Sequence, residues 1–402
     1  ASPLYSQDVE TTAVFGQVDW DVTERLMLSV GGRWLDEEKN ACMTVSGYPV
    51  NPLQTILGLP PGSVANTDVA GYDKTLDSYP FLTGGALAAG SWGENCPDWA
   101  SSVYDPSFDG SASFDDFTPR VSAQYGFDNG MAYVTYSEGF RSGGFNGRAS
   151  APDNTGPYDP ESVKSWEAGA KFTMFDNKFQ LNLAAFTVKY EDKQEDIVKP
   201  GEDGQATLTI VENASSATME GLEMDFTWII AEGLSLRGNV GLLDASYDDF
   251  LTSSATGMVD KSSIELRRAP DMTAGLGLLF ERPLAAGHWF VASVNYTWKD
   301  DYYISAPANA DHSTAGYIDN PSKVDAFGLL DASINWETEN FTVSLFGKNL
   351  TDETYLMSFL DVGANVVAAG PNDTTPVYAP GSWSFGTPNR PRYFGVEVQL
   401  KF

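Results

Sequence analysis

Stretches in which apolar and polar residues alternate with a period of two recur along the whole chain. At the end of the chain, one face carries Phe394, Val396, Val398, Leu400 and Phe402, with glycine and polar residues between them. Side chains alternate between two faces along a β-strand, whereas a helix repeats every 3.6 residues. The pattern therefore predicts an all-β chain.

About thirteen segments carry this alternation, and each is roughly 10–16 residues long. They lie near residues 12–22, 25–38, 117–127, 131–140, 162–174, 178–191, 215–230, 234–247, 268–281, 288–300, 326–336, 340–350 and 390–402. Strands of soluble proteins usually run ~5–6 residues, whereas a tilted strand crosses the membrane hydrocarbon in ~9–11 residues. The segment lengths therefore favour a tall barrel. Within 178–191 the apolar residues move from odd-numbered to even-numbered positions, that is, from one face of the strand to the other. This change predicts a β-bulge near Ala184 and Ala185 or a strand that rises above the membrane.

The connections between these segments alternate between short and long. The short ones consist of turn-forming residues, such as Asp-Asn-Gly at 128–130 and Ala-Glu-Gly at 231–233. The long ones span roughly residues 39–116, 141–161, 192–214, 248–267, 301–325 and 351–389. Tight periplasmic turns that alternate with long extracellular loops are typical of outer-membrane barrels, and a β-sandwich does not sort its loops in this way. We therefore expect a transmembrane antiparallel β-barrel.

Composition is compatible with this fold and opposes other classes of protein. The 55 acidic and 24 basic residues give a net charge of −31, which disfavours binding to nucleic acid phosphates. No run approaches the roughly 18 apolar residues of a membrane helix. The predicted outward faces carry aromatic residues and leucine, whereas charged residues lie on the inward faces. This sorting is required because Lys or Arg facing lipid at the midplane costs ~2–4 kcal/mol.

Strand direction gives an expectation about the extent of the barrel. The last strand follows a long outer loop and therefore ends on the periplasmic side, at Phe402. Counting back about thirteen strands, the first also runs towards the periplasm, although single-chain bacterial barrels have even strand numbers. We therefore expect further strands before Ala1, so that residues 1–402 form the C-terminal portion of a larger barrel.

Five segments, in order along the chain, resemble those of TonB-dependent outer-membrane receptors. They are YVTYSEGFRSGGFNGR (Tyr133–Arg148), SWEAGAKF (Ser165–Phe172), MEGLEMDF (Met219–Phe226), LFGKNLTDETY (Leu345–Tyr355) and RPRYFGVEVQLKF (Arg390–Phe402). Each segment alone is a weak signal, but five in order are a strong one, and the resemblance covers essentially the whole chain. The EGFRSGGFN segment is most similar to receptors for iron complexes.

The resemblance implies a barrel of 22 strands with a plugged lumen. The thirteen or so strands here are then the C-terminal ones, and an N-terminal plug domain and the first strands lie outside this sequence. It also implies TonB-dependent uptake, in a Gram-negative outer membrane, of a scarce nutrient, most of all a ferric siderophore, with no intrinsic cofactor. The implied partners are the TonB–ExbB–ExbD complex, the barrel-assembly machinery, lipopolysaccharide, phospholipid and a surface lipoprotein.

Other functions remain as alternatives. Cobalamin, an oligosaccharide or another bulky nutrient fits the same mechanism, and a passive porin or an adhesin is the alternative from another class. No enzyme is predicted, because the chain lacks a G-x-S-x-G pattern, and its two histidines, His288 and His312, are far apart. The same scarcity of histidine disfavours a zinc site and haem binding. Acidic loops such as residues 71–77 leave calcium binding open.

We expect the ligand to contact the outer loops and the upper lumen. The candidate residues are Arg141, Phe145, Asn146, Tyr302, Tyr303 and Trp383. An arginine offers a fixed fork of donors to carboxylate or catecholate oxygens, and aromatic rings give flat contact surfaces. Alternatively, Arg141 pairs with Glu138 or with the plug, and the tyrosines belong to the interfacial belt.

Two further predictions concern assembly. Cys42 and Cys96 both lie in the long connection at residues 39–116, and we expect them to form a disulfide. Closing that loop removes ~4 kcal/mol of freedom from the unfolded chain in the entropy model. The terminal aromatic Phe402, with Phe394 on the same face, resembles the signal that the barrel-assembly machinery reads. The alternative is a closing strand whose outward face only has to match lipid.

Overall fold

The computed structural model describes most of the chain and all of its long strands. The described residues are 4–44, 108–147, 149, 154–199, 208–254, 257–305, 322–361, 366–368, 376–378 and 384–401. Cys96, His312, Trp383, Phe402 and the acidic loop at 71–77 lie outside these ranges. Among the described residues, no helix is long and apolar enough to cross a membrane.

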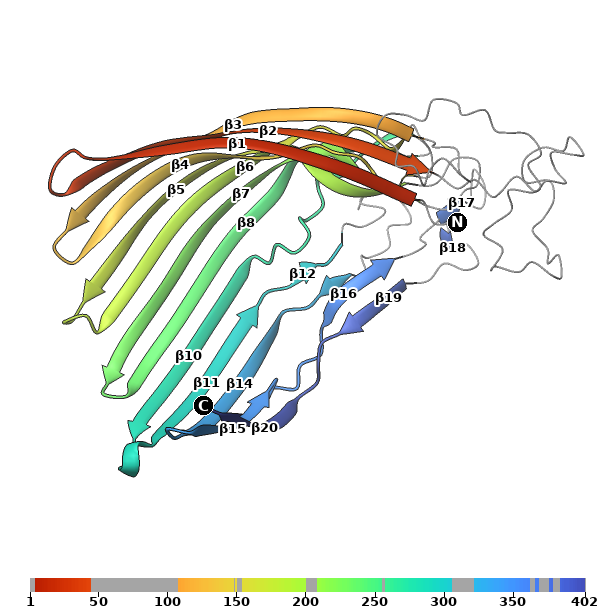
Figure 1. The fold of residues 1–402 in the computed structure, drawn as a ribbon. Helices are drawn as coiled ribbons and strands as arrows, with labels where there is room; N and C mark the ends of the chain where they lie inside the picture. Colours follow the sequence, from red (N-terminus) through yellow and green to blue (C-terminus); the bar gives the residue numbers. More distant parts are fainter. Residues whose placement is uncertain are drawn as a thin grey trace, which may run out of the picture.

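Thirteen antiparallel strands lie side by side, in sequence order, in one curved sheet (Figure 1). They are β1 (Leu4–Asp21), β2 (Leu26–Thr44), β3 (Phe108–Phe127), β4 (Gly130–Arg141), β5 (Glu161–Met174), β6 (Phe179–Lys199), β7 (Leu208–Ala231), β8 (Leu234–Ser254), β10 (Met272–Pro283), β11 (Trp289–Lys299), β14 (Phe327–Glu337), β15 (Phe341–Lys348) and β20 (Tyr393–Leu400). Each overlaps one segment expected from the alternation, so the all-β prediction and its strand order are confirmed.

The remaining strands are short and lie within the long connections. They are β9 (Gly257–Asp260), β12 (Tyr302–Tyr303), β13 (Lys323–Val324), β16 (Leu356–Asp361), β17 (Val366–Ala368), β18 (Pro376–Tyr378) and β19 (Ser384–Pro388). β9 pairs with β8, and the others form three two-stranded sheets. We call the end of the sheet that carries these long connections the outer end.

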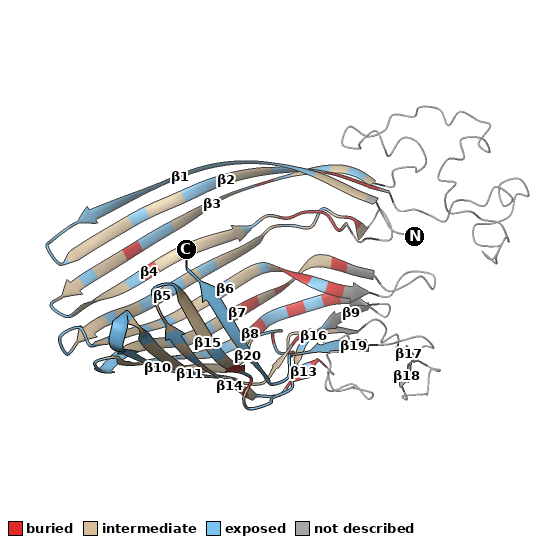
Figure 2. Ribbon diagram, turned by 60° about the horizontal axis from the view of Figure 1, so that its bottom comes forward, coloured by how far each residue is buried: buried red, intermediate tan, exposed pale blue. Residues whose placement is uncertain are grey.

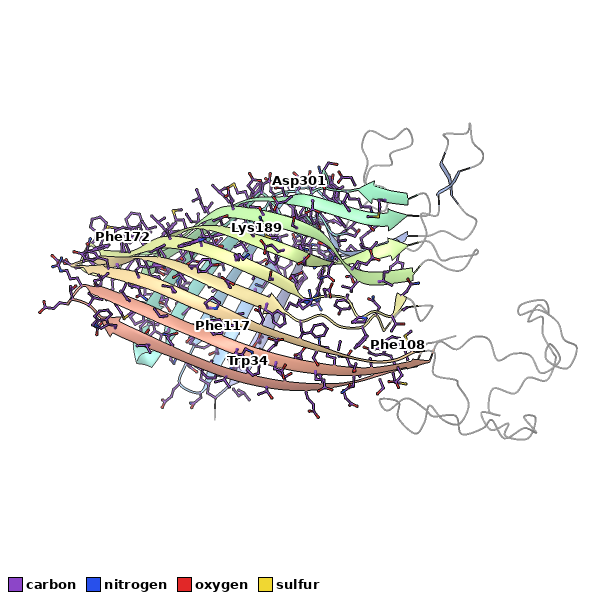
Figure 3. All side chains as sticks on the ribbon, turned by 90° about the horizontal axis from the view of Figure 1, so that it is seen from above. Trp34, Phe108, Phe117, Phe172, Lys189 and Asp301 are labelled. Carbon is purple, nitrogen blue, oxygen red and sulfur yellow. The ribbon has the colours of Figure 1, made fainter. Side chains whose placement is uncertain are left out.

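The outward face of the sheet is apolar and uncovered. Val18, Trp20 and Val396 are 69%, 62% and 67% exposed, although each projects from the middle or lower part of a strand. Side chains project from both faces of the wall (Figure 3), and exposed residues recur along its strands (Figure 2). Large apolar side chains would be costly in water, so this face is built to contact lipid.

Tight turns join the strands at the opposite end, as the sequence predicts. Phe175, Asp176 and Asn177 have φ angles of 55°, 54° and 65°, which only a short, strained turn requires. Gly233 has a φ of 71°, and a Cβ atom there would stand 2.0 Å from the carbonyl oxygen of Glu281. Glycine is therefore required in this turn on both counts.

The strands from β1 to β3 and from β6 to β8 extend further outward than the alternation predicts. β7 reaches 24 residues, whereas β4 has 12 and β5 has 14. The predicted bulge near Ala184 and Ala185 is wrong, because β5 and β6 stay in register across both residues. The register of β6 against β7 shifts between Tyr190 and Lys193, and the strand continues to Lys199. The alternative of a strand that rises beyond the alternating segment is the one observed.

Buried residues gather towards the outer end of the molecule (Figure 2). The apolar cluster there consists of Ile197, Ala217, Tyr247, Phe250, Ile264 and Leu266. It joins the tall ends of β6, β7 and β8 to the connection between β9 and β10. The core of this molecule thus lies above the lipid-facing wall, where the connections fold back on the strands.

Candidate functional site

The described part of the connection between β4 and β5, residues 142–147, 149 and 154–160, lies at the outer end of the wall. Both flanking strands are short, and their neighbours β3 and β6 continue past them. The register places Lys39 and Phe114 on the face opposite the lipid-facing side chains, which is the luminal face. Lys39 and Phe114 both contact this connection. It is therefore folded inward, against the lumen side of the wall.

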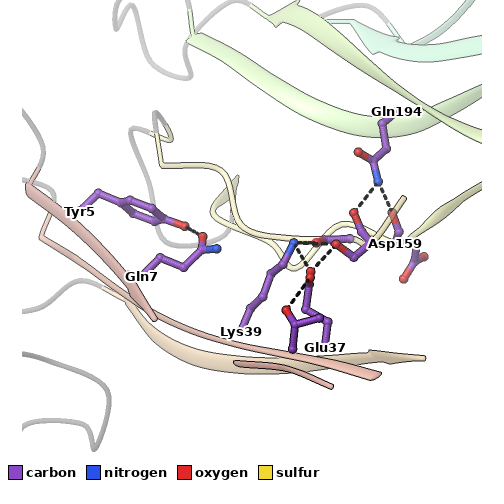
Figure 4. A network of polar contacts seen from close by, with 9 residues as sticks. Tyr5, Gln7, Glu37, Lys39, Asp159 and Gln194 are labelled. Atoms are coloured by element: carbon purple, nitrogen blue, oxygen red, sulfur yellow. Dashed lines mark hydrogen bonds and ion pairs between the residues drawn. The ribbon is translucent and has the colours of Figure 1, made fainter. Parts of the chain in front are cut away.

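A compact polar group anchors the start of this connection to β2 (Figure 4). The Lys39 ammonium lies 2.9 Å from a Glu37 carboxylate oxygen, and the two side chains are only 14% and 15% exposed. The same ammonium donates to Ser142 Oγ at 2.8 Å and to the Gly143 carbonyl at 2.7 Å. Ser142 Oγ in turn donates to Glu37. The hydrogen bonds to both charged groups offset the cost of burying them.

A second set of hydrogen bonds fixes the connection to the tall strands β6 and β7. The Asn146 amide donates to the Val211 carbonyl at 3.2 Å and accepts from the Val211 N–H at 2.7 Å. The Gln194 amide donates to the carbonyls of Ser142 and Asp159, at 3.0 and 3.1 Å (Figure 4). The described part of the connection is therefore held on both sides; we call residues 142–147, 149 and 154–160 the β4–β5 shelf.

Three of the predicted site residues belong to or adjoin this shelf. Phe145 is 6% exposed and its ring lies 5.4 Å from that of Phe108, and Asn146 is 8% exposed. These contacts give both residues a structural role, and their role in ligand contact stays a prediction. Arg141 is exposed at the end of β4 and forms no ion pair among the described residues, so the alternative of pairing with Glu138 is not observed.

The Tyr158 phenol is close enough to Arg141 for the two to interact electrostatically. Burial raises the pKa of Tyr158, on the shelf, and the positive charge of Arg141 opposes that rise. The phenol is consequently neutral at physiological pH and can donate a hydrogen bond beside the guanidinium. The Asp196 carboxylate adds to the rise in the pKa of Tyr158, so this phenol is influenced by a cation and an anion together.

Tyr302 and Tyr303 lie on another part of the outer end, in β12, which pairs with β13. The Lys299 ammonium stands 5.3 Å from the centre of the Tyr302 ring, and Lys323 stands 5.7 Å from that of Tyr303. Burial raises the pKa of Tyr302, with Arg268 opposing the rise. The structure thus brings both predicted tyrosines together with three cations.

Arg268 is a residue that the sequence reasoning missed. It follows Arg267 in the connection between β9 and β10, and its backbone N–H donates to the Tyr303 carbonyl at 2.7 Å. Arg267 reaches the buried Glu195 at 2.7 Å, whereas the Arg268 guanidinium is exposed. An Arg-Arg pair in a loop carries no periodicity, and only the fold separates the anchoring arginine from the free one.

Free cations remain at the outer end despite the net charge of −31. Lys39, Lys193, Arg267 and Lys323 are each within ion-pair distance of a carboxylate. Arg141, Arg268 and Lys299, by contrast, form no ion pair within the ranges that the structure describes. All three have a tyrosine as neighbour. These three cations are therefore available to an anionic ligand at the outer end.

The remaining predicted positions are the two cysteines, the two terminal phenylalanines and Trp383. Cys42 is completely buried at the end of β2 and is disulfide-bonded, but its predicted partner Cys96 lies outside the described residues. Phe394 is 72% exposed at the start of β20, and Phe402 is not described. Trp383 also lies outside the described ranges. Within those ranges, no group of three or more His, Cys, Asp or Glu side chains is placed to hold a metal.

The family model for TonB dependent receptor-like β-barrels matches residues 2–350. The chain belongs to this family. Barrels of this family reside in the outer membrane of Gram-negative bacteria, so the apolar face of the wall is its lipid contact and the long connections face the exterior. The relatives found are receptors and transporters, not enzymes.

Individual relatives agree with the family. The pesticin receptor of Yersinia enterocolitica is 25% identical over 264 residues, which are 64% of this chain and 35% of that receptor. The ferric yersiniabactin uptake receptor FyuA from Yersinia pestis superposes with a TM-score of 0.66 at 17% identity, over 100% of this chain and 47% of that one. The ferric-catecholate import receptor Fiu from Escherichia coli K12 gives 0.57 at 16% identity, over 98% and 45%.

Sequence identity and coverage set what these relatives show about the chain. At 16–17% identity, the solved structures show a shared fold and no more. The chain spans about half the length of these solved relatives, and 35% of the pesticin receptor. It therefore carries part of the barrel wall and of its outer loops.

Proposed function

We propose that the receptor containing this chain imports an anionic ferric complex of the siderophore type, by active uptake that depends on TonB. The observation that carries the proposal is a set of three cations, Arg141, Arg268 and Lys299, that form no ion pair with any described residue and lie near neutral phenols at the outer end of a TonB-dependent receptor barrel. The ferric ion is cargo in this proposal and not a resident cofactor.

Physical chemistry explains the choice of an anion. Guanidinium groups form short, paired hydrogen bonds with carboxylate and catecholate oxygens, and these bonds are stronger than those between neutral groups. Tyrosines add flat contact area at a low cost in side-chain entropy. Because the chain as a whole is acidic, an anionic ligand needs local cations, and Arg141, Arg268 and Lys299 provide them at the outer end.

The larger assembly is part of the proposal. Among the described residues, β1 pairs only with β2, and β20 only with β15. An open sheet edge in hydrocarbon leaves backbone groups unsatisfied, at several kcal/mol each. We infer that further strands of the same protein complete the barrel and that a plug domain fills it. TonB–ExbB–ExbD then supplies energy, the barrel-assembly machinery inserts the wall, lipopolysaccharide and phospholipid surround it, and a surface lipoprotein is a further candidate partner.

Uptake by cells tests the function directly. Cells whose only receptor of this kind is the intact protein should accumulate radiolabelled iron from an anionic ferric tris-catecholate complex, and deletion of tonB should abolish the accumulation. Uptake that persists without TonB would point to a passive barrel. If the cells took up cobalamin or an oligosaccharide and no iron complex, the proposed substrate class would be wrong.

Arg141 gives the proposal a test at one residue. Replacing it with alanine should weaken binding of the anionic complex by ~1.5–3 kcal/mol, about 10–150-fold, because a charged hydrogen bond is lost. Lys178→Ala, in a periplasmic turn, is the matched control that removes a cation elsewhere. Unchanged affinity would remove Arg141 from the site.

A further inference from the structure

We infer that Arg268 is a specificity-determining residue for the anionic ligand, and that Glu195 is a positioning residue that holds it in place through Arg267. The inference rests on the proposed function and deepens it. It starts from a buried ionic cluster that a lipid-facing wall does not need.

Glu195 is the centre of that cluster. It is 1% exposed, and its carboxylate accepts hydrogen bonds from Tyr247 at 2.8 Å, from Arg267 at 2.7 Å and from Lys193. A carboxylate so deeply buried is stable only when charged and polar partners surround it. These partners come from β6, β8 and the β9–β10 connection, so the cluster joins three separate parts of the chain.

Apolar contacts fix the same connection from the other side. Ile264 and Leu266, on either side of Glu265, are 5% exposed and pack in the cluster with Ile197 and Phe250. Two inserted aliphatic residues and the ion pairs of Arg267 with Glu195 and Asp196 anchor residues 264–267. The next residue, Arg268, therefore leaves the anchored segment from a fixed point.

The backbone of Arg268 carries strain that its surroundings impose. Its φ of 59° lies in the left-handed region, which a residue with a side chain seldom adopts. The hydrogen bond from its N–H to the Tyr303 carbonyl, at 2.7 Å, holds this conformation. Residues kept in strained conformations cluster at ligand-binding sites, because a relaxed alternative would not aim the side chain correctly. Glycine would fit this backbone better, so replacing Arg268 with glycine removes the side chain without adding strain.

The Arg268 guanidinium has no carboxylate partner among the described residues. Arg268 is exposed. The neighbouring Arg267 forms an ion pair with Glu195 and lies 3.7 Å from Asp196. Burial raises the pKa of Tyr302, and the positive charge of Arg268 lowers it in part. The β4–β5 shelf repeats this arrangement: Ser142 is anchored by Lys39 and Glu37, and the adjacent Arg141 is free. At both places a carboxylate of low exposure fixes a loop, and a residue adjacent to the fixed segment presents a cation.

The recognised chemistry is an oxygen anion on a rigid ligand, such as a catecholate or carboxylate group. A guanidinium can pair two donors with two such oxygens in one plane, which an ammonium cannot do. The neutral Tyr302 phenol next to it provides a flat contact. A neutral hydroxamate complex has no net negative charge, so it gains less from the Arg268 guanidinium.

Arg268→Gly separates binding from folding. In the purified intact receptor it should weaken binding of a ferric tris-catecholate at least tenfold, leave binding of a neutral ferric tris-hydroxamate unchanged, and not lower the melting temperature, since glycine relieves the strained φ. Arg268→Lys, which keeps the charge, should lie between the two. Equal loss for both complexes, or a lowered melting temperature with no selective loss, would overturn the assignment.

Glu195→Gln tests the positioning role. The carboxamide keeps the shape but loses the charge that holds Arg267, so binding of the tris-catecholate should weaken and become less sensitive to salt. Glu195→Asp should recover part of both effects, and Asp128→Asn, at the periplasmic end, is the control. An unchanged salt dependence in Glu195→Gln would refute the positioning role.

The two proposals fail in different ways. A wild-type receptor that binds no anionic ferric complex overturns the proposed function, and this inference falls with it. A wild-type receptor that binds the tris-catecholate tightly, with Arg268→Gly binding equally well, overturns the inference alone.

Discussion

The lipid-facing wall and the outer end of this barrel are held together by different means. In the wall, neighbouring strands pair through backbone hydrogen bonds, and many large apolar side chains are exposed, chiefly on the face that contacts lipid in the membrane. At the outer end, charged side chains such as Glu195 and Lys39 are buried in hydrogen-bonded clusters. The stability of the wall therefore depends on a repeated pattern, which many sequences satisfy. The stability of the outer end, which we also call the mouth, depends on individual residues.

The sharpest test of the wall is a charge on its lipid face. Val396→Arg, near the middle of β20, should destabilise the intact receptor by ~2–4 kcal/mol, because an arginine at the membrane midplane must be moved out of water. Gln399→Arg, on the luminal face of the same strand, is the control and should be nearly neutral. Denaturant titration in lipid vesicles measures both. Equal effects would mean that the assignment of the two faces is wrong.

Breaking the ion pair of the shelf should have the next largest effect. Lys39→Met leaves Glu37 buried without its cation, and loss of one partner of a fully buried pair costs ~3–5 kcal/mol. Both side chains retain some exposure, 14% and 15%, so we expect ~2–3 kcal/mol. Protease cleavage within residues 142–160 reports the release of the shelf.

The double variant Glu37→Gln with Lys39→Met supplies the control for this prediction. Once both charges are gone, no ion is left buried alone, and the double variant should be more stable than Lys39→Met. Additive losses would mean that the pair does not act as a unit.

The wall could be predicted because one physical rule governs it everywhere. Lipid on one face and water on the other impose a period of two, so all thirteen strands and the tight turns were legible in the sequence. Strand ends were not, because beyond the membrane the alternation is no longer required: β7 begins at Leu208, whereas its alternating segment begins near residue 215.

The mouth could be predicted only in part. Arg141, Tyr302 and Tyr303 were identified by residue type and loop position, and they do lie at the outer end. Asn146 was identified for the same reasons, yet it binds the backbone of Val211. Pairing between residues distant in sequence decides which polar group is used for folding and which stays free, and no local pattern records it. Arg268 was missed for that reason.

Asn146→Ala measures what that hydrogen bonding contributes at the mouth. It removes two bonds to Val211 and leaves a partly buried N–H without its partner, which should cost ~1–2 kcal/mol. Asn182→Ala, which removes one exposed bond to Asp225 on the wall, should cost less than half as much. Hydrogen exchange at Val211 should speed up only in the first variant. Protection that persists there would show that another group holds this amide.

The smallest effect is expected where an ion pair resembles that of the mouth but lies in water. Arg25 and Asp128 join two periplasmic turns at 2.8 Å, with side chains 54% and 89% exposed. Water and salt screen such a pair, and exposed pairs contribute ~0–1 kcal/mol. Arg25→Ala should therefore lower the stability of the receptor by less than Lys39→Met does, and the difference from wild type should shrink further in 1 M salt, where the Debye length falls to about 3 Å. The comparison holds the type of contact constant and varies only its burial. If Arg25→Ala proved as damaging as Lys39→Met, burial would not be what distinguishes the mouth from the rest of the barrel, and the contrast between the two regions would have to rest on the free arginines alone.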